Sequence, residues 1–307
     1  MSAPAHEIRV TAEDAGARLD AFVGARAGVS RAVAAKLIAA GAVTVGGRPA
    51  TKSLRVEEGM AVVVALPPAA TATLDAEDIP ITVVYEDEHL LVVSKPPGLV
   101  VHPAPGHPSG TLVNALLARA GALPAGGSAE RPGIVHRLDS GTSGLMIVAK
   151  DEATHAALTE ALAARAVTRI YTALVDGIPD TDTATIDAPI GRSTRNRKKM
   201  GVVAGGRPSI TEISVLERHA ETALVEARPI TGRTHQIRVH LAAAKHPVIG
   251  DRVYGHDRKL AADLGLGRPF LHAARLSFEH PSTGARIELS DPLPTDLVTA
   301  LELARAR

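Results

Sequence analysis

The sequence predicts an α+β protein with two folded parts, and three observations lead to this prediction. A stretch rich in Pro, Ala, Thr and acidic residues, 67–78, is typical of a linker. It separates a short N-terminal unit, 17–66, from a longer C-terminal domain, 79–307. In both parts, apolar runs bounded by turn residues indicate strands, and runs with helical spacing lie between them.

Composition limits the class of protein. Hydrophobic residues make up 45% of the 307 residues and support a real core, although aromatics are only 2%. The absence of cysteine excludes disulfides, thiolate zinc sites and cysteine nucleophiles, and it fits a reducing compartment. No apolar run is long enough to span a membrane, and Met1–Val10 lacks the apolar core of a signal peptide. We therefore expect a cytoplasmic protein, and we expect it to be a monomer.

The N-terminal unit is predicted to contain two short helices. Leu19, Phe22 and Val23 lie on one face of the first. Ser30 is a good N-cap for the second, which should run to residue 40 and stop at Gly41.

Strands are predicted at 43–49 and 62–64, and the unit is basic. Its charged residues are Arg18, Arg26, Arg31, Lys36, Arg48, Lys52 and Arg55 against Asp20, Glu57 and Glu58, which gives seven minus three, or +4. The whole chain has a net charge of only +1. The unit is either a solvated basic face or a surface for an acidic partner.

The C-terminal domain shows a regular succession of elements. Those expected are a hairpin over 81–93, a helix over 111–120, buried strands at 133–135 and 145–149, a helix over 152–165 capped by Asp151, a strand over 169–177, strands near 209–218 and 222–228, a helix bearing Ile237, Leu241 and Ala244, strands at 270–273 and 287–289, and a helix over 295–305.

A polar turn between the two buried strands carries the strongest chemical signal. Asp139 stands where the first strand gives way to the turn, and Arg137 lies two positions before it. On a strand these two side chains would share a face. Asp139 either caps the turn, as Asp often does, or supplies a carboxylate to a site.

Longer motifs favour the second interpretation. The run His136–Asp139, His-Arg-Leu-Asp, followed by Ser-Gly-Thr-Ser-Gly-Leu, resembles the signature of the RluA/RluD-type pseudouridine synthases. The strand around Tyr171 and the run Gly232–Arg238 are similar to the second and third motifs of that family. The resemblance implies a catalytic domain with a mixed, mostly antiparallel sheet and flanking helices.

The resemblance also implies roles for individual residues. Asp139 would be the catalytic carboxylate, and Arg233 would keep it charged. Tyr171 would stack on the target base or move a proton, although packing alone would explain a lone tyrosine in a strand. The substrate contacts would be His136, Arg137, which fills the gap left by the flipped base, and Ile237, which forms an apolar wall.

Two further regions point to RNA. Residues 17–66 resemble the α-L RNA-binding module of a ribosomal protein, so Arg18, Arg31 and Lys36 are candidate RNA contacts. Between 191 and 206 there is no acidic residue, and Arg195, Arg197 and Lys198 lie within a predicted flexible basic loop. The loop either neutralises phosphates or is merely solvated.

The sequence therefore predicts an isomerase that converts uridine to pseudouridine in structured RNA, above all large-subunit ribosomal RNA. The same reaction on transfer RNA and a non-catalytic RNA-binding or ribosome-assembly factor are the alternatives. A glycosidase would need two carboxylates, and the motifs contain only Asp139. The isomerisation is neither a redox reaction nor a hydrolysis, so we expect no metal, no redox cofactor and no membrane partner. The residues leave open whether Asp139 forms a sugar adduct, forms a ring adduct or acts through an elimination.

Overall fold

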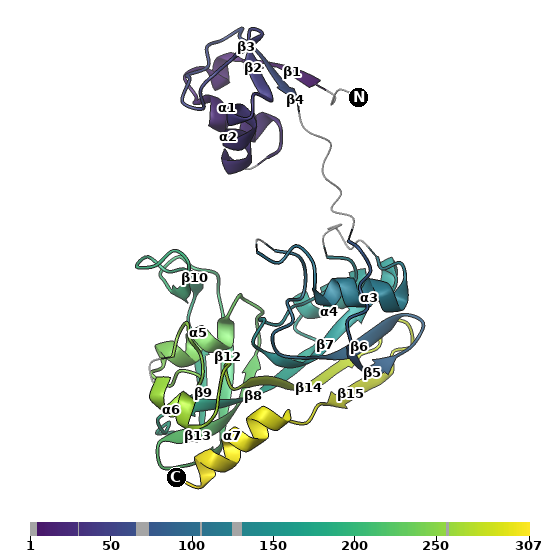
Figure 1. The fold of residues 1–307 in the computed structure, drawn as a ribbon, viewed down its shortest axis with the longest axis vertical. Helices are drawn as coiled ribbons and strands as arrows, with labels where there is room; N and C mark the ends of the chain where they lie inside the picture. Colours follow the sequence, from purple (N-terminus) through teal and green to yellow (C-terminus); the bar gives the residue numbers. More distant parts are fainter. Residues whose placement is uncertain (1–4, 30, 66–73, 105, 125–130, 256–257) are drawn as a thin grey trace. The chain divides into compact units, whose positions relative to one another are not determined.

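The computed structural model describes residues 5–29, 31–65, 74–104, 106–124, 131–255 and 258–307 (Figure 1). The chain divides into two compact units, 1–73 and 74–307. The predicted cap Ser30 and most of the predicted linker 67–78 lie outside the described residues.

The first unit is a four-stranded sheet with two helices. Its elements are β1 (Ala5–Arg9), the 3-10 helix η1 (Ala12–Asp14), α1 (Leu19–Arg26), α2 (Arg31–Ala39), β2 (Val43–Val45), β3 (Arg48–Pro49) and β4 (Ala61–Ala65). The sheet order is β1-β4-β2-β3. Leu19, Phe22 and Val23 are buried, as the helical pattern predicts. The sequence did not predict β1, which pairs with β4 and so begins the sheet before residue 17.

The second unit is built on a nine-stranded sheet. Its strands are β5 (Thr82–Glu86), β6 (Leu90–Lys95), β7 (Ser143–Ala149), β8 (Thr168–Asp176), β9 (Thr183–Asp187), β12 (Ile210–Arg218), β13 (Thr222–Pro229), β14 (Leu271–Glu279) and β15 (Arg286–Ser290). The order is β5-β6-β7-β14-β8-β13-β12-β9, with β15 beside β14. Only the β7–β14 pair is parallel, so the mixed, mostly antiparallel sheet is confirmed.

Helices cover this sheet and fill its two cores. They are α3 (Leu112–Ala120), α4 (Glu152–Ala163), α5 (Gln236–Ala243), α6 (Arg258–Asp263) and α7 (Thr295–Arg305). Alternate residues of β6 enter different cores, since Leu91 packs in the cluster with α3 and Leu90 in the cluster with α4. Asp151 caps α4 as predicted and accepts from Thr154 N. No helix in the described part of the chain is long and apolar enough to cross a membrane.

The start of β7 positions the turn that carries His136–Asp139, which we call the motif turn. There β7 runs parallel to β14, with Ser143 opposite His272 and Gly144 opposite Ala273. Gly144 has φ +113°, and a Cβ on it would lie 2.4 Å from the carbonyl oxygen of Ala273. Only glycine permits this approach, which fixes the turn just before it.

Two predictions about local structure are wrong. Residues 133–135 do not form a strand, because only Ile134 bridges β7, at Val148, and Gly133 has φ +72°. The basic segment 191–206 is a β-hairpin rather than a loop without regular structure, with β10 (Ile190–Arg192) paired to β11 (Met200–Val202). Pairing of both arms gives the backbone hydrogen bonds that a flexible loop would leave to water.

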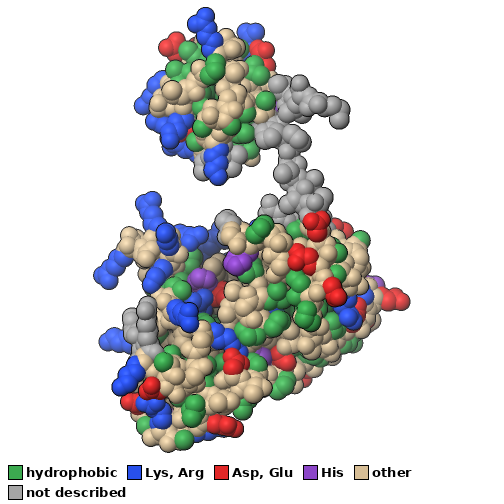
Figure 2. Space-filling view, in the orientation of Figure 1, with side chains coloured by type: hydrophobic (Ala, Val, Ile, Leu, Met, Phe, Trp, Pro, Cys, Tyr) green, Lys and Arg blue, Asp and Glu red, His purple; other side chains and the backbone are tan. Residues whose placement is uncertain are grey.

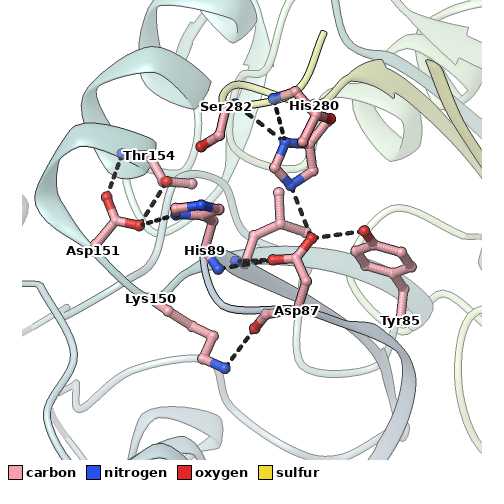
Figure 3. Close-up of polar contacts among 10 residues, drawn as sticks. Tyr85, Asp87, His89, Lys150, Asp151, Thr154, His280 and Ser282 are labelled. Atoms are coloured by element: carbon pink, nitrogen blue, oxygen red, sulfur yellow. Dashed lines mark hydrogen bonds and ion pairs between the residues drawn. The ribbon is translucent and has the colours of Figure 1, made fainter. Parts of the chain in front are cut away.

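A polar cluster, which we call the turn cluster, joins the β5–β6 turn to the β14–β15 turn (Figure 3). Asp87 accepts hydrogen bonds from the hydroxyl of Tyr85 (2.6 Å), from His280 Nε2 (2.8 Å) and from two backbone N–H groups. His89 Nδ1 lies 3.1 Å from Asp151 Oδ2. Burial raises the pKa of Asp87, but the hydrogen bonds outweigh burial and the net pKa is lowered.

Candidate active site

A pocket of about 450 Å³ in the second unit brings together the predicted motif residues. Its lining includes His136, Arg137, Asp139, Tyr171, Arg233 and Ile237. These residues come from the turn before β7, from β8 and from the segment leading into α5. Three motifs that are far apart in the sequence therefore meet at one cavity.

Asp139 stands in the turn that enters β7. Its carbonyl oxygen accepts from the N–H of Thr142 at 3.0 Å, which closes the turn. Its carboxylate is only 18% exposed, and Oδ2 accepts a 2.8 Å hydrogen bond from Arg238 Nη1. Oδ1 has His235 Nε2 at 3.8 Å, beyond hydrogen-bond distance. One carboxylate oxygen of this pocket-lining residue is thus held, and the other has no hydrogen bond from a described residue.

The ion-pair partner of Asp139 is Arg238, so the prediction of Arg233 in that position is wrong. Arg233 precedes α5 and directs its Nε to the carbonyl of Pro208 at 3.4 Å. Arg238 lies in the first turn of α5 and is buried. The helix begins at Gln236, and its register turns Arg238 toward the carboxylate.

A second carboxylate fixes the orientation of Arg238. Asp251 accepts from Arg238 Nε at 2.6 Å and from Nη2 at 2.9 Å, a bidentate pair in the interior. Burial lowers the pKa of Arg238, but the bonds to Asp251 and the charge of Asp139 outweigh it and the net pKa is raised. Burial also works against ionisation of Asp251, and Arg238 nonetheless lowers its pKa. Arg238 therefore carries a permanent charge between two carboxylates.

Tyr254 connects the start of β11, next to the tip loop of the β10–β11 hairpin, to this group. Its hydroxyl accepts from Met200 N at 3.1 Å and lies 2.8 Å from His235 Nδ1. Its ring lies 5.1 Å from the guanidinium carbon of Arg238, within cation–π range. His235 adopts a left-handed backbone, φ 58°, which is uncommon for a residue other than glycine. The basic hairpin and the Arg238–Asp139 ion pair thus share a support at Tyr254.

Lys95 supports the motif turn from below. It is fully buried, and its Nζ donates to the carbonyl oxygens of Pro96, Leu99 and Ser140 at 2.9–3.2 Å. Burial lowers the pKa of Lys95 to about 7, although the charge of Asp139 opposes that shift. The three carbonyls hold the residue after Asp139 against the 96–99 loop.

Tyr171 and Ile237 form the apolar part of the pocket. Tyr171 is 7% exposed and Ile237 is 6% exposed. Burial raises the pKa of Tyr171, so the phenol keeps its proton at neutral pH. The predicted apolar stripe of α5 includes Leu241, whereas Ala244 lies just after the helix and is exposed.

His136 has a structural contact that the sequence did not indicate. Its Nε2 accepts from the backbone N–H of Ile147 at 3.0 Å, so in the neutral ring Nδ1 carries the proton. Burial, with the charge of Arg169, lowers the pKa of His136 to about 3. The imidazole is therefore neutral at pH 7 and holds β7 to the motif turn.

The remaining candidate residues lie outside the pocket. Arg195, Arg197 and Lys198 are exposed at the tip of the β10–β11 hairpin, where Lys and Arg side chains gather in Figure 2. In the first unit, Arg18 and Arg31 both pair with Asp20, at 3.1 and 3.2 Å.

These pairs lower the pKa of Asp20 to about 2, Arg18 having the largest effect. Lys36 is exposed. Of the seven basic residues counted in the first unit, Arg18 and Arg31 therefore share one internal carboxylate, that of Asp20, which the net charge of +4 already includes.

Comparison with known proteins assigns the two units of the chain to two different families. The profile of the RNA pseudouridylate synthase family matches residues 89–243, and the profile of the S4 domain matches residues 17–62. The ribosomal large subunit pseudouridine synthase D of Zymomonas mobilis subsp. mobilis is 40% identical over 304 residues, 96% of each chain. The chain belongs to the RNA pseudouridylate synthase family.

Further relatives agree with this assignment. The ribosomal large subunit pseudouridine synthase D of Pseudomonas aeruginosa is 46% identical over 239 residues, 75% of this chain and 73% of that protein. The solved structure of human RNA pseudouridylate synthase domain containing 1 has a TM-score of 0.57 at 28% identity, over 75% of this chain and 87% of that one. The predictions of an α+β fold and of an RNA pseudouridine synthase with an S4-type module are confirmed.

Sequence reasoning missed three supporting residues of this pseudouridine synthase. Arg238 stood within the quoted third motif, yet nothing local distinguished it from Arg233. Asp251 and Tyr254 lie in a turn-rich stretch with no periodicity, and only the contact with α5 shows their roles. A search for carboxylates able to pair with each motif arginine would have found Asp251 as one candidate among many.

Proposed function

We propose that this pseudouridine synthase acts on structured large-subunit ribosomal RNA and that Asp139 is its catalytic carboxylate. The observation that carries the proposal is the half-held carboxylate of Asp139, a residue that lines the pocket: Arg238 donates to Oδ2 at 2.8 Å, and Oδ1 has no hydrogen bond from a described residue. Asp139 is also the only carboxylate among the described residues that line this pocket. The names of the relatives from Zymomonas and Pseudomonas support ribosomal RNA as the substrate.

The reaction requires one nucleotide to leave the RNA stack, because its glycosidic bond is otherwise covered. The bond between uracil N1 and ribose C1′ breaks, the ring turns, and C5 bonds to C1′. The proton on C5 leaves to solvent, and N1 gains one. In the proposal, Arg137 at the exposed rim of the pocket occupies the gap left in the stack.

The pocket offers each group that this scheme needs. Asp139 reacts through Oδ1, at the sugar or at the ring, while Arg238 and Asp251 keep it oriented. Tyr171 lies against the base with its phenol protonated, and Ile237 closes the apolar wall. The S4-type unit, with Arg18, Arg31 and Lys36, and the hairpin cations provide contacts with RNA phosphates.

Release of tritium from RNA labelled at uracil C5 tests the proposal directly. Ribosomal RNA transcripts and transfer RNA are assayed separately, with wild type and Asp139→Asn side by side. We expect release from the large-subunit transcript by wild type and none by the variant. Release from transfer RNA alone would show that transfer RNA, and not ribosomal RNA, is the substrate. Equal release by both proteins would show that Asp139 is not the catalytic carboxylate.

A further inference from the structure

The lining of the active-site pocket has a large excess of positive charge. Among its described residues it contains five arginines, namely Arg131, Arg137, Arg169, Arg233 and Arg238, against the single carboxylate of Asp139. Arg238 is already paired with two carboxylates. The other four bring charge that no acid in the described lining compensates, so the pocket favours an anionic ligand.

Arg169 and Arg233 are the half-buried members of these four, and Arg169 differs from Arg233 in that its Nε is buried without a partner among the described residues. Arg169 lies on β8 two residues before Tyr171, so the two side chains emerge on the same face of the strand. No carboxylate among the described residues pairs with it. Its Nη2 reaches the carbonyl of Pro229 at 3.5 Å, the limit of a hydrogen bond, and its buried Nε has no partner among the described residues.

The described neighbours of Arg169 supply no negative charge. His136, whose pKa is lowered by burial and by the charge of Arg169, is a neutral imidazole at pH 7. Gly232 lies beside the guanidinium, and a Cβ there would come within 3.3 Å of Nη1. A partly desolvated cation without a counter-ion is costly unless a bound anion supplies one.

We propose that Arg169 forms a subsite for a backbone phosphate of the RNA next to the target uridine. The inference rests on the proposed function only in taking the occupant of the pocket to be a uridine flipped out of RNA. A phosphodiester carries a full negative charge, which would balance the positive charge of Arg169. Its two free oxygens also suit the geometry of a guanidinium. A neutral uracil carbonyl would leave the charge uncompensated. Arg169 is therefore a binding residue that holds the flipped nucleotide by its backbone while Tyr171 faces the base.

A salt series of binding titrations tests this subsite without relying on turnover. The probe is a large-subunit ribosomal RNA transcript, and the proteins are wild type, Arg169→Met, Arg169→Lys and Arg228→Met. Arg228 is the matched control, because it is exposed, pairs with Glu212, and lines a hollow with Thr168 and Ile170 on the opposite face of β8. Thermal melting of each variant shows that it is folded.

We expect Arg169→Met to lower the log–log salt slope by about 0.7 to 0.9 and to weaken binding about tenfold. Arg169→Lys should keep the slope, because the charge remains, and Arg228→Met should match wild type. A wild-type slope for Arg169→Met would overturn the subsite. If Arg169→Met fails to fold, a slope for Arg169→Lys below that of wild type would likewise overturn it.

A second arm distinguishes the phosphate from the base. A short synthetic RNA carries the uridine identified by tritium release, with one neutral methylphosphonate on its 5′ or its 3′ side. Wild type should lose about tenfold in affinity for one of these RNAs, and Arg169→Met should lose nothing more. If the wild-type affinity is the same with either methylphosphonate as without it, or if wild type and Arg169→Met lose affinity equally, then Arg169 contacts the base and not a phosphate. An active Asp139→Asn would refute the proposed function and leave the slope result standing.

Discussion

Two polar clusters of the catalytic domain, the turn cluster and the pocket, differ in how much of the hydrogen-bonding capacity of their central carboxylate is used. In the turn cluster, Asp87 accepts four hydrogen bonds from Tyr85, His280 and two backbone N–H groups (Figure 3). In the pocket, Asp139 accepts one side-chain hydrogen bond, and Arg169 has no carboxylate partner among the described residues. Both oxygens of Asp87 accept hydrogen bonds, whereas Oδ1 of Asp139 receives none from a described residue.

The difference separates a structural cluster from a reactive one. Ser282 and Thr283 donate their N–H groups to His280 Nδ1, so His280 holds one tautomer and joins two turns. Such a saturated group offers nothing to a substrate. An unsaturated carboxylate beside a volume of about 450 Å³ can react with one. Four predictions test this contrast, from the largest expected effect on turnover to the smallest.

Asp139→Asn should reduce turnover at least about a thousandfold, because the amide keeps the shape of the carboxylate and loses its charge and nucleophilicity. Binding of RNA should stay within several-fold of wild type, since the phosphate contacts are unchanged. Tritium release and binding titrations measure the two quantities. Turnover above a few per cent of wild type would place the chemistry elsewhere.

Asp251→Asn should lower kcat by about 10- to 100-fold while KM changes little, because Asp251 orients Arg238 and does not itself line the pocket. The matched control is Asp87→Asn, the same carboxylate-to-amide change in the turn cluster. A fall in kcat of equal size in both variants would show that general destabilisation, rather than the orientation of Arg238, explains the loss. Single-turnover kinetics at saturating RNA separate the two.

Replacing Arg195, Arg197 and Lys198 of the hairpin tip by Ala should weaken binding to many RNAs alike and leave kcat near wild type. If all three contact phosphates, the log–log salt slope should fall by about two to three units. Titrations on target and non-target RNA supply the measurement. An unchanged slope would indicate a solvated tip, and a loss confined to one RNA would indicate base reading.

Asp87→Asn should leave turnover per folded molecule unchanged and lower the free energy of unfolding by about 2 kcal/mol, because buried donors lose a charged acceptor. The folded pKa of Asp87 is below its unfolded value of about 3.9, so its contribution is full above that pH. It is lost as pH falls through the lower, folded value.

The stability gap between wild type and Asp87→Asn should therefore be constant from pH 5 to 8 and shrink in acid. Urea unfolding across pH checks this, and Tyr85→Phe offers a milder break in the same cluster. A loss of turnover at full folding would contradict the structural assignment of the turn cluster.

The sequence by itself determined most of the elements and the residues that meet at the pocket. Periodicity and turn residues are local, so they placed the 81–93 hairpin, α3, α4, β8 and α7 within a few residues. The same local signals failed at 133–135, where only Ile134 bridges β7 and Gly133 has a positive φ, and at 191–206, where pairing makes a hairpin.

Only the tertiary structure decided which charges meet. Arg238 and Asp139 are 99 residues apart, and the register of α5 selects Arg238 over Arg233. The sequence likewise does not show that Arg169 lacks a carboxylate partner among the described residues, because this depends on which acidic side chains the fold places near it. Local patterns fix backbone conformation over a few residues, whereas an ion pair needs two side chains brought within 4 Å by the packing of separate elements.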